Sequence, residues 1–152
     1  MNLPLLSILT WLPVLGGVAV MLIGDQRASL ARWAALLVSL VALGFSIPLW
    51  THFDATSAAL QFVERMPWVP AVHSDYYLGI DGIALPLIVL TTFSTVLVII
   101  AGWSVIEKRP SQYYAAFLIM EGLMVGVFSA ADALLFYVFW DCLLYTSDAA
   151  DE

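Results

Sequence analysis

Residues Leu78–Arg109 read LGIDGIALPLIVLTTFSTVLVIIAGWSVIEKR, and this stretch decides the fold class. Within it, a run of 24 residues, Ile83–Ile106, carries no charged side chain. An Asp-Gly pair (81–82) precedes the run and Glu-Lys-Arg (107–109) follows it. Since ~20 apolar residues in one helix cross the ~30 Å hydrocarbon core of a bilayer, the stretch predicts a transmembrane helix with charges at both ends.

The composition of the whole chain is that of a membrane protein. Of its 152 residues, 62% are hydrophobic and 11% are charged, against about half and a quarter in soluble domains. Much of the net charge of −7 comes from four acids at and after Asp141. The charge therefore says little about partners, and no nucleic-acid partner is expected. The single cysteine, Cys142, excludes an internal disulfide framework and a Cys-rich metal site.

Four segments predict membrane-spanning helices, and a fifth begins but stops short. No basic residue precedes the first segment, so we expect a retained helix rather than a cleaved signal peptide. After Ala133 only about 14 residues are roughly apolar, too few to span a bilayer. The expected fold is therefore an all-α integral membrane protein with four transmembrane helices plus a truncated fifth. The four predicted spans are Leu3–Ile23, Trp33–Trp50, Ile83–Ile106 and Tyr113–Ala130.

The basic residues predict how the chain is oriented. Four of the five bases lie in residues 24–32 and 107–112, and the positive-inside rule places such connections in the cytoplasm. The expected location is the cell inner membrane, with the N-terminus and the Thr51–Asp81 connection outside. That connection carries Pro-Trp-Val-Pro (67–70) and a Tyr pair (76–77), which are typical of a membrane interface. Alternating apolar residues around Leu60–Val63 allow a short β-hairpin.

Two acids fall inside the predicted helices at matching distances from the turn Ser129–Ala133. Glu121 lies about eight residues, roughly 12 Å, into the fourth span, and Asp141 lies eight residues into the fifth helix. Asp132 is placed as the N-cap of the fifth helix. We therefore expect both carboxyls at nearly equal depth on neighbouring antiparallel helices. A buried acid must be protonated or paired. Proton relay is the favoured role, and a hydrogen-bonded structural acid is the alternative.

The other polar residues are given mainly structural roles. Asp81 is expected to cap the third span at its N-terminus. Glu107 is expected to form a surface ion pair with Lys108, and the alternative is a place at the mouth of a proton path. His52 and His73 have no ligand partners at metal spacing, so both are expected at the surface. The sequence shows no Gly-rich phosphate loop, catalytic triad or pair of intramembrane histidines, which argues against a soluble enzyme and a cytochrome.

These motifs resemble those of one family, NADH-quinone oxidoreductase subunit M, the counterpart of mitochondrial NADH dehydrogenase subunit 4. The resemblance covers residues 1–141 and is most specific from residue 66 onward. It is carried by MPWVP (66–70), LGIDGIALPL (78–87), Trp103, IEK (106–108), MEG (120–122), GVF (126–128) and DALLFYVFW (132–140).

The resemblance implies a proton-translocating, antiporter-like subunit of complex I, in which electron transfer from NADH to quinone drives protons through intramembrane acids and lysines. FMN, iron–sulfur clusters and quinone belong to other subunits, so no cofactor is expected in this chain. The implied partners are other membrane subunits of complex I and the lipid bilayer. Asp141, where the family has glutamate, and Glu107 match the family's proton chain. The family's lysines lie further along, so this fragment alone is not expected to pump.

The sequence departs from the family after Trp140. Cys142–Glu152, CLLYTSDAADE, is similar to the translation of a sequencing adapter, and such tails are excluded from fold reasoning. A glutamate codon cut after two bases and completed by C would read GAC, so we expect the genome to encode glutamate where this chain has Asp141. Residues 1–141 then form the native region and 142–152 a non-native tail. A truncated gene with an unusual tail is the alternative.

Two other functions are kept open. A subunit of a cation/proton antiporter or a membrane-bound hydrogenase would share the acid at position 141, but its match to GIDGIALP and IEK would be poorer. A small non-catalytic membrane assembly protein would tolerate replacement of both Glu121 and Asp141 without loss of respiration.

Overall fold

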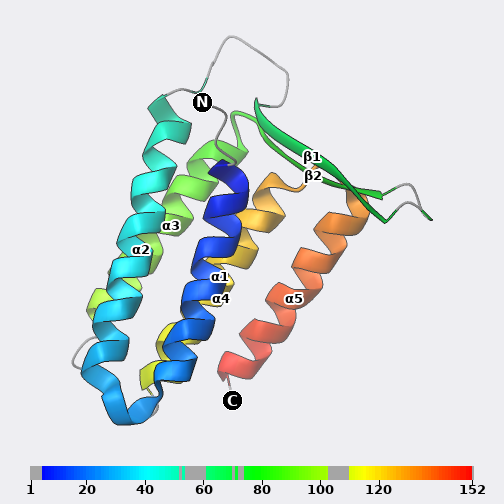
Figure 1. Cartoon of the computed structure of the whole chain (residues 1–152). Coiled ribbons are helices and arrows are strands. Elements are labelled where there is room, and N and C mark those ends of the chain that lie inside the picture. The colour runs from blue at the N-terminus through cyan, green and yellow to red at the C-terminus, as the bar shows by residue number, and fades with distance from the viewer. Residues whose placement is uncertain are drawn as a thin grey trace.

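The computed structural model describes residues 5–51, 53, 61–69, 71, 74–102 and 110–151. Figure 1 shows helices that run alternately up and down, with a β-hairpin across the end of the bundle where α1 begins. That end is called the hairpin end below. The elements are α1 (Leu5–Ile23), a 3₁₀ turn (Asp25–Arg27), α2 (Ala28–Thr51), β1 (Gln61–Val69), β2 (Ser74–Ile80), α3 (Ala84–Ala101), α4 (Pro110–Ser129) and α5 (Ala133–Asp151).

The number of membrane-spanning helices agrees with the sequence prediction. In the described part of the chain, α1, α2, α3 and α4 are long and apolar enough to cross a membrane, whereas α5 has only a shorter apolar stretch, Ala133–Thr146. The helix itself continues to Asp151, because alanine and acidic residues can extend a helix that is no longer apolar. The prediction of four spans plus a truncated fifth is confirmed.

Several helix boundaries differ from the predicted spans, because hydropathy locates apolar residues whereas backbone hydrogen bonds define the helix. Helix α2 begins at Ala28, five residues before the predicted Trp33, because Ser29 and Arg32 continue the helix without being apolar. Helix α4 begins at Pro110, whose missing N–H is harmless in the first turn. Helix α3 ends at Ala101, where the Gly102 N–H donates to the Val98 carbonyl at 3.0 Å. The predicted end of that span, at 106, lies outside the described residues.

Two aspartates start the helices for which they were predicted. One Asp81 carboxylate oxygen accepts hydrogen bonds from the N–H groups of Ile83 and Ala84, at 3.1 and 2.8 Å. One Asp132 carboxylate oxygen accepts from Leu134 and Leu135, at 2.9 and 3.3 Å. The first N–H groups of a helix have no partner within the helix, so these carboxylates satisfy them. The cap by Asp132 is confirmed, whereas Asp81 bonds the start of α3 from two residues before its N-cap position, Ile83.

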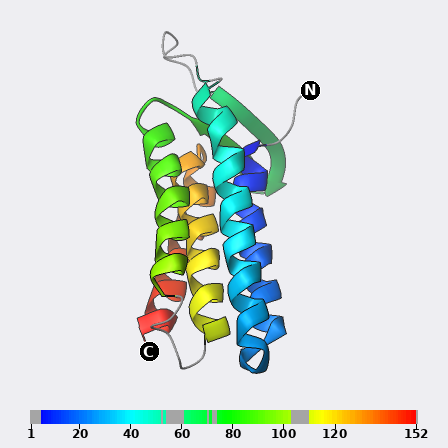
Figure 2. The ribbon, with the colours of Figure 1, turned by 90° about the vertical axis from the view of Figure 1, so that its left-hand side faces the viewer.

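Helix α4 lies at the centre of the bundle. It packs against each of the other four helices, and 56% of its Gln112–Ser129 segment is buried, compared with 28% for Ser29–Thr51 of α2. Figure 2 shows α4 between α3 and the pair α1 and α2. A polar side chain on α4 can therefore be shielded from lipid on every side.

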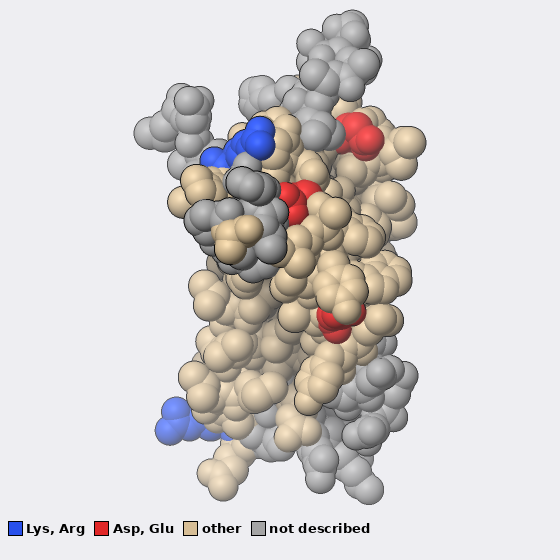
Figure 3. All heavy atoms as spheres, turned by 90° about the vertical axis from the view of Figure 1, so that its right-hand side faces the viewer, with Lys and Arg blue, Asp and Glu red and all other residues tan. Residues whose placement is uncertain are grey.

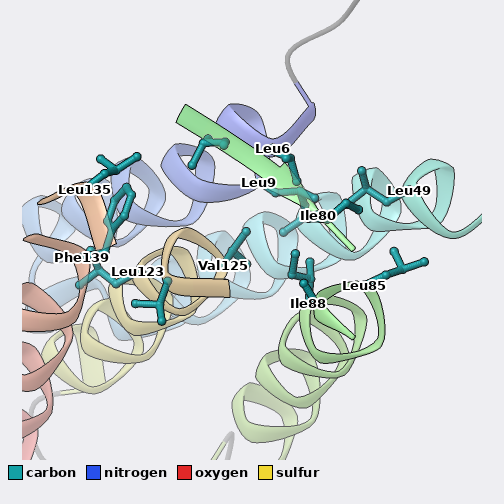
Figure 4. Packing of buried hydrophobic residues seen from close by; sticks show 14 residues of the cluster. Leu6, Leu9, Leu49, Ile80, Leu85, Ile88, Leu123, Val125, Leu135 and Phe139 are labelled. Carbon is teal, nitrogen blue, oxygen red and sulfur yellow. The ribbon is translucent and has the colours of Figure 1, made fainter. Parts of the chain in front are cut away.

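Two apolar clusters hold the helices together. The cluster at the hairpin end joins all five helices to β2, as Figure 4 shows through Leu9, Ile80 and Ile88. The second cluster lies toward the other end and includes Val20, Ile99, Tyr114 and Leu118. Outside these clusters, the helices expose many large apolar side chains, and the described residues on the α5 side include few charged ones in Figure 3. Such a surface suits lipid or protein contact within a membrane.

The hairpin is longer than predicted and is fastened to the bundle. Strands β1 and β2 pair antiparallel, with Arg65 opposite Tyr77 and Met66 opposite Tyr76. The outer edge of β2 then meets the α4–α5 turn, where the Ala131 N–H donates to the Tyr77 carbonyl at 2.8 Å. A two-stranded hairpin alone is marginally stable in water, so this docking accounts for its order.

Candidate functional site

The candidate site is centred on Glu121 in α4. Its side chain is 1% exposed, and neither carboxyl oxygen has a hydrogen-bond partner among the described residues. Within the part of the chain that the structure describes, no other Asp, Glu, Lys or Arg side chain is buried. Leu118 and Val125, one turn away on either side, are fully buried on the same helix face. Burying a carboxyl group without a partner is costly, which singles out this position as a functional candidate.

The helices also bury several hydroxyl groups, and nearly all of these hydroxyls have hydrogen-bond partners in the described structure. The Thr92 hydroxyl donates to the Ser46 hydroxyl at 3.3 Å and so joins α3 to α2. Ser39 and Ser129 donate to carbonyl oxygens of their own helices, at 2.8 and 2.7 Å. Thr10 in α1 is the exception, because its buried hydroxyl has no partner in the described structure. Among the described buried side chains, Thr10 and Glu121 therefore differ in having oxygens without a hydrogen-bond partner.

Asp141 lies in a different environment from Glu121. It is exposed on α5, and Tyr137 lies one turn earlier on the same helix. The two helices are antiparallel neighbours whose facing ends are Ser129 and Ala133, so each carboxyl lies eight residues, roughly 12 Å, from the turn. The matched position along the helices agrees with the sequence argument. The two carboxyls are not hydrogen-bonded to each other, because Glu121 points into the bundle.

Glu107, His52 and His73 lie outside the described residues. Among the described side chains, no three His, Cys, Asp or Glu residues gather as metal ligands, and Cys142 is exposed on α5.

A polar cluster at the hairpin end was missed by the sequence analysis. Glu64 of β1 accepts a hydrogen bond from the Ser7 backbone N–H at 3.1 Å and another from the Ser7 hydroxyl. The Tyr76 hydroxyl lies 3.0 Å from the Ser7 hydroxyl, and it accepts a hydrogen bond from the Trp11 indole N–H at 2.9 Å. The one sequence signal was the spacing of Ser7 and Trp11, which places them on one face of α1.

The fold and the site together define a class of protein. The chain is a multi-pass α-helical membrane protein, and its described residues include a carboxyl group, that of Glu121, buried at the centre of the bundle. Its family is shown by comparison with known sequences, since residues 29–129 match the family described as NADH-ubiquinone oxidoreductase chain 4, amino terminus. The chain belongs to this family, and the resemblance inferred from its motifs is confirmed.

Individual relatives agree with this assignment. The chain is 43% identical over 139 residues to NADH-ubiquinone oxidoreductase chain 4 of Arabidopsis thaliana, covering 91% of this chain and 28% of the relative. It is 39% identical over 141 residues to NADH-quinone oxidoreductase subunit M of Rhodobacter capsulatus, covering 90% and 27%. It is 37% identical to an NAD(P)H-quinone oxidoreductase chain 4 of Thermosynechococcus vestitus, covering 91% and 26%. The chain thus spans just over a quarter of the length of these relatives.

Proposed function

We propose that this chain forms the amino-terminal part of a proton-translocating membrane subunit of NADH:quinone oxidoreductase. In that complex, electron transfer from NADH to quinone takes place in other subunits, and this subunit moves protons across the membrane. The observation that carries the proposal is Glu121, a carboxyl group buried without a partner at the centre of a membrane bundle. The family assignment supports the same function.

The chemistry follows from the surroundings of the acids. A carboxyl group in an apolar interior pays a large cost when it is charged and unpaired, so a small change in its surroundings shifts its balance between protonated and ionised. Glu121 can therefore accept a proton, hold it and release it when the neighbouring helices or charges move. Asp141 offers a second carboxyl, and Glu107 is proposed as a third on the family pattern. In this proposal the three acids bind and release protons in turn, and no redox group is placed in this chain.

The proposed orientation follows the basic residues. Arg27 is exposed in the turn between α1 and α2, at the end opposite the hairpin. Basic connections favour the cytoplasmic side, so we place the hairpin end outside the cell inner membrane. Other membrane subunits of the complex and lipid would then cover the exposed apolar side chains.

The test uses the complete subunit in its assembled complex. Acid-to-amide changes at Glu121 and at position 141 are compared with Ser39→Ala, which removes a buried hydroxyl that bonds only its own helix. Inverted membrane vesicles are assayed for NADH oxidation and for protons taken up per NADH. We expect both amide variants to lower proton uptake while the complex still assembles. Normal proton uptake in both amide variants would contradict the proposal and would favour a structural or assembly role.

A further inference from the structure

We propose that protons pass between Glu121 and the hairpin end along the α1–α4 interface, with Glu64 at the mouth of the path and the hydroxyls of Ser7 and Thr10 between them. This inference rests on the proposed function, and it names the residues by which one side of the membrane communicates with the buried acid.

The mouth is the hydrogen-bonded cluster around Glu64. Its carboxylate is half-buried and accepts from both the N–H and the hydroxyl of Ser7. Because the Ser7 hydroxyl donates to Glu64, the Tyr76 hydroxyl is left to donate to Ser7. The first turn of a helix carries unpaired N–H groups and a partial positive charge, which fixes the Glu64 carboxylate over the start of α1. A titratable group is thus held at the point where α1 enters the bundle.

Thr10 supplies the next polar group. It lies three residues after Ser7, on the same face of α1 and about 4.5 Å further along the helix axis. Its side chain is fully buried, and its hydroxyl has no partner among the described residues. Its carbonyl oxygen abuts Gly122 of α4. Thr10 is therefore at the depth of Glu121, the residue next to that contact.

Both residues at this depth carry side-chain oxygens without a partner in the described structure. In the described part of the chain, the buried side-chain oxygens without a hydrogen-bond partner are the Thr10 hydroxyl and the two carboxyl oxygens of Glu121. A buried water needs two to four polar partners, and these three oxygens are of the kind that would bind one. Proton transfer then needs no redox change. Each hydroxyl or water accepts a proton on its oxygen and releases its own hydrogen to the next acceptor, so one proton leaves Glu121 and one arrives at Glu64.

The path ends at Glu121 because α1 offers no hydroxyl or charged side chain beyond Thr10. From Leu12 to Ile23 the helix has no hydroxyl, acidic or basic side chain. Gly17 of α1 packs directly against Ala115 and Ile119 of α4, which closes the interface toward the other end. The arrangement is therefore a one-sided access route, open only toward the hairpin.

The decisive test removes either the hydroxyl or the methyl group of Thr10 in the complete subunit within its complex. Thr10→Val keeps the shape and removes the hydroxyl, whereas Thr10→Ser keeps the hydroxyl and removes a methyl group. A path through Thr10 predicts that the Ser variant retains protons pumped per NADH and the Val variant loses them. A purely structural role predicts the reverse order, since valine preserves the packing. Ser39→Ala is the matched control for loss of a buried hydroxyl.

Substitutions at Glu64 test the same path at its outer end. Glu64→Gln keeps one of the two acceptor oxygens but cannot carry the proton, and it is expected to reduce protons pumped per NADH, with Glu64→Asp restoring part of the loss. Normal pumping in Thr10→Val and Glu64→Gln, alongside impaired pumping in the amide variant at position 141, overturns the path and leaves the proposed function standing. Normal pumping in the amide variants at 121 and 141 overturns the proposed function itself.

Discussion

The carbonyl oxygen of Thr10 in α1 lies against Gly122 in α4, so close that a side chain at position 122 would overlap it. Small residues let membrane helices approach each other in this way. The contact fixes the relative depth of α1 and α4, and it therefore fixes which hydroxyl of α1 lies level with Glu121.

The close approach at Gly122 predicts a large cost for a small substitution. In Gly122→Ala, the added carbon would meet the Thr10 backbone and would lie 2.6 Å from a methyl carbon of Val14. Overpacking of this kind typically costs about 1–3 kcal/mol. We expect a lower thermal unfolding midpoint for the detergent-solubilised subunit.

Gly44→Ala is the control for that substitution. Nothing lies within 4 Å of a carbon added at Gly44 in α2, and alanine is favoured over glycine inside a helix by roughly 0.5–1 kcal/mol. This variant should unfold at the same temperature as the parent or slightly higher. Equal midpoints for the two alanine variants would show that α1 and α4 do not approach closely at Gly122.

The cap of α3 gives a second prediction. In Asp81→Ala, the N–H groups of Ile83 and Ala84 lose their carboxylate partner, and loss of a helix cap costs about 0.5–2 kcal/mol. Asp81→Asn retains an acceptor oxygen and should be nearly neutral. Thermal unfolding of both variants in detergent measures the difference. The idea would be rejected if the asparagine variant were as unstable as the alanine variant.

The hydrogen bond between Trp11 and Tyr76 predicts energetic coupling between α1 and the hairpin. Trp11→Phe and Tyr76→Phe each remove that bond, whose heavy atoms lie 2.9 Å apart. A double-mutant cycle isolates their interaction, and about 0.5–1.5 kcal/mol of coupling is expected for one hydrogen bond. Amide hydrogen exchange in β1 and β2 provides the readout. Strictly additive effects would mean that the hairpin is held by other contacts.

The codon at position 141 gives a prediction that needs no protein. We expect adapter-free genomic reads to show GAA or GAG there, followed by an apolar reading frame in place of residues 142–152. The physical reason is that the apolar pattern of α5 stops at Thr146, short of what a membrane span requires. A genuine GAC codon followed by this same tail and a stop would mean that the tail is native.

Much of the fold was predictable because its signals are local. Hydropathy located the four spans, since each span must satisfy its own backbone hydrogen bonds inside lipid. Asp81 and Asp132 were predicted as caps because a cap needs only the next three residues. The early start of α2 was missed because hydropathy marks the apolar region and says nothing about how far a helix extends into water.

The candidate site was predictable only in part. The sequence placed Glu121 and Asp141 at equal distances from their shared turn, because the rise of a helix is constant. It could not distinguish a buried acid from an exposed one. That difference depends on how α4 and α5 are rotated against their neighbours, and the even spread of apolar residues around α4 gives no preferred face.

The sequence by itself determined a multi-pass membrane protein, the roles of Asp81 and Asp132 at two helix starts, its family and the two acids in its helices, because these depend on residue type and spacing along one chain. The tertiary structure decided that α4 is central, that Glu121 is buried while Asp141 is exposed, and that Glu64 meets Ser7 across 57 residues of sequence. These relations depend on which helices pack together and at what rotation. Glycine contacts between helices and the docked hairpin set that packing, and neither has a local sequence signature.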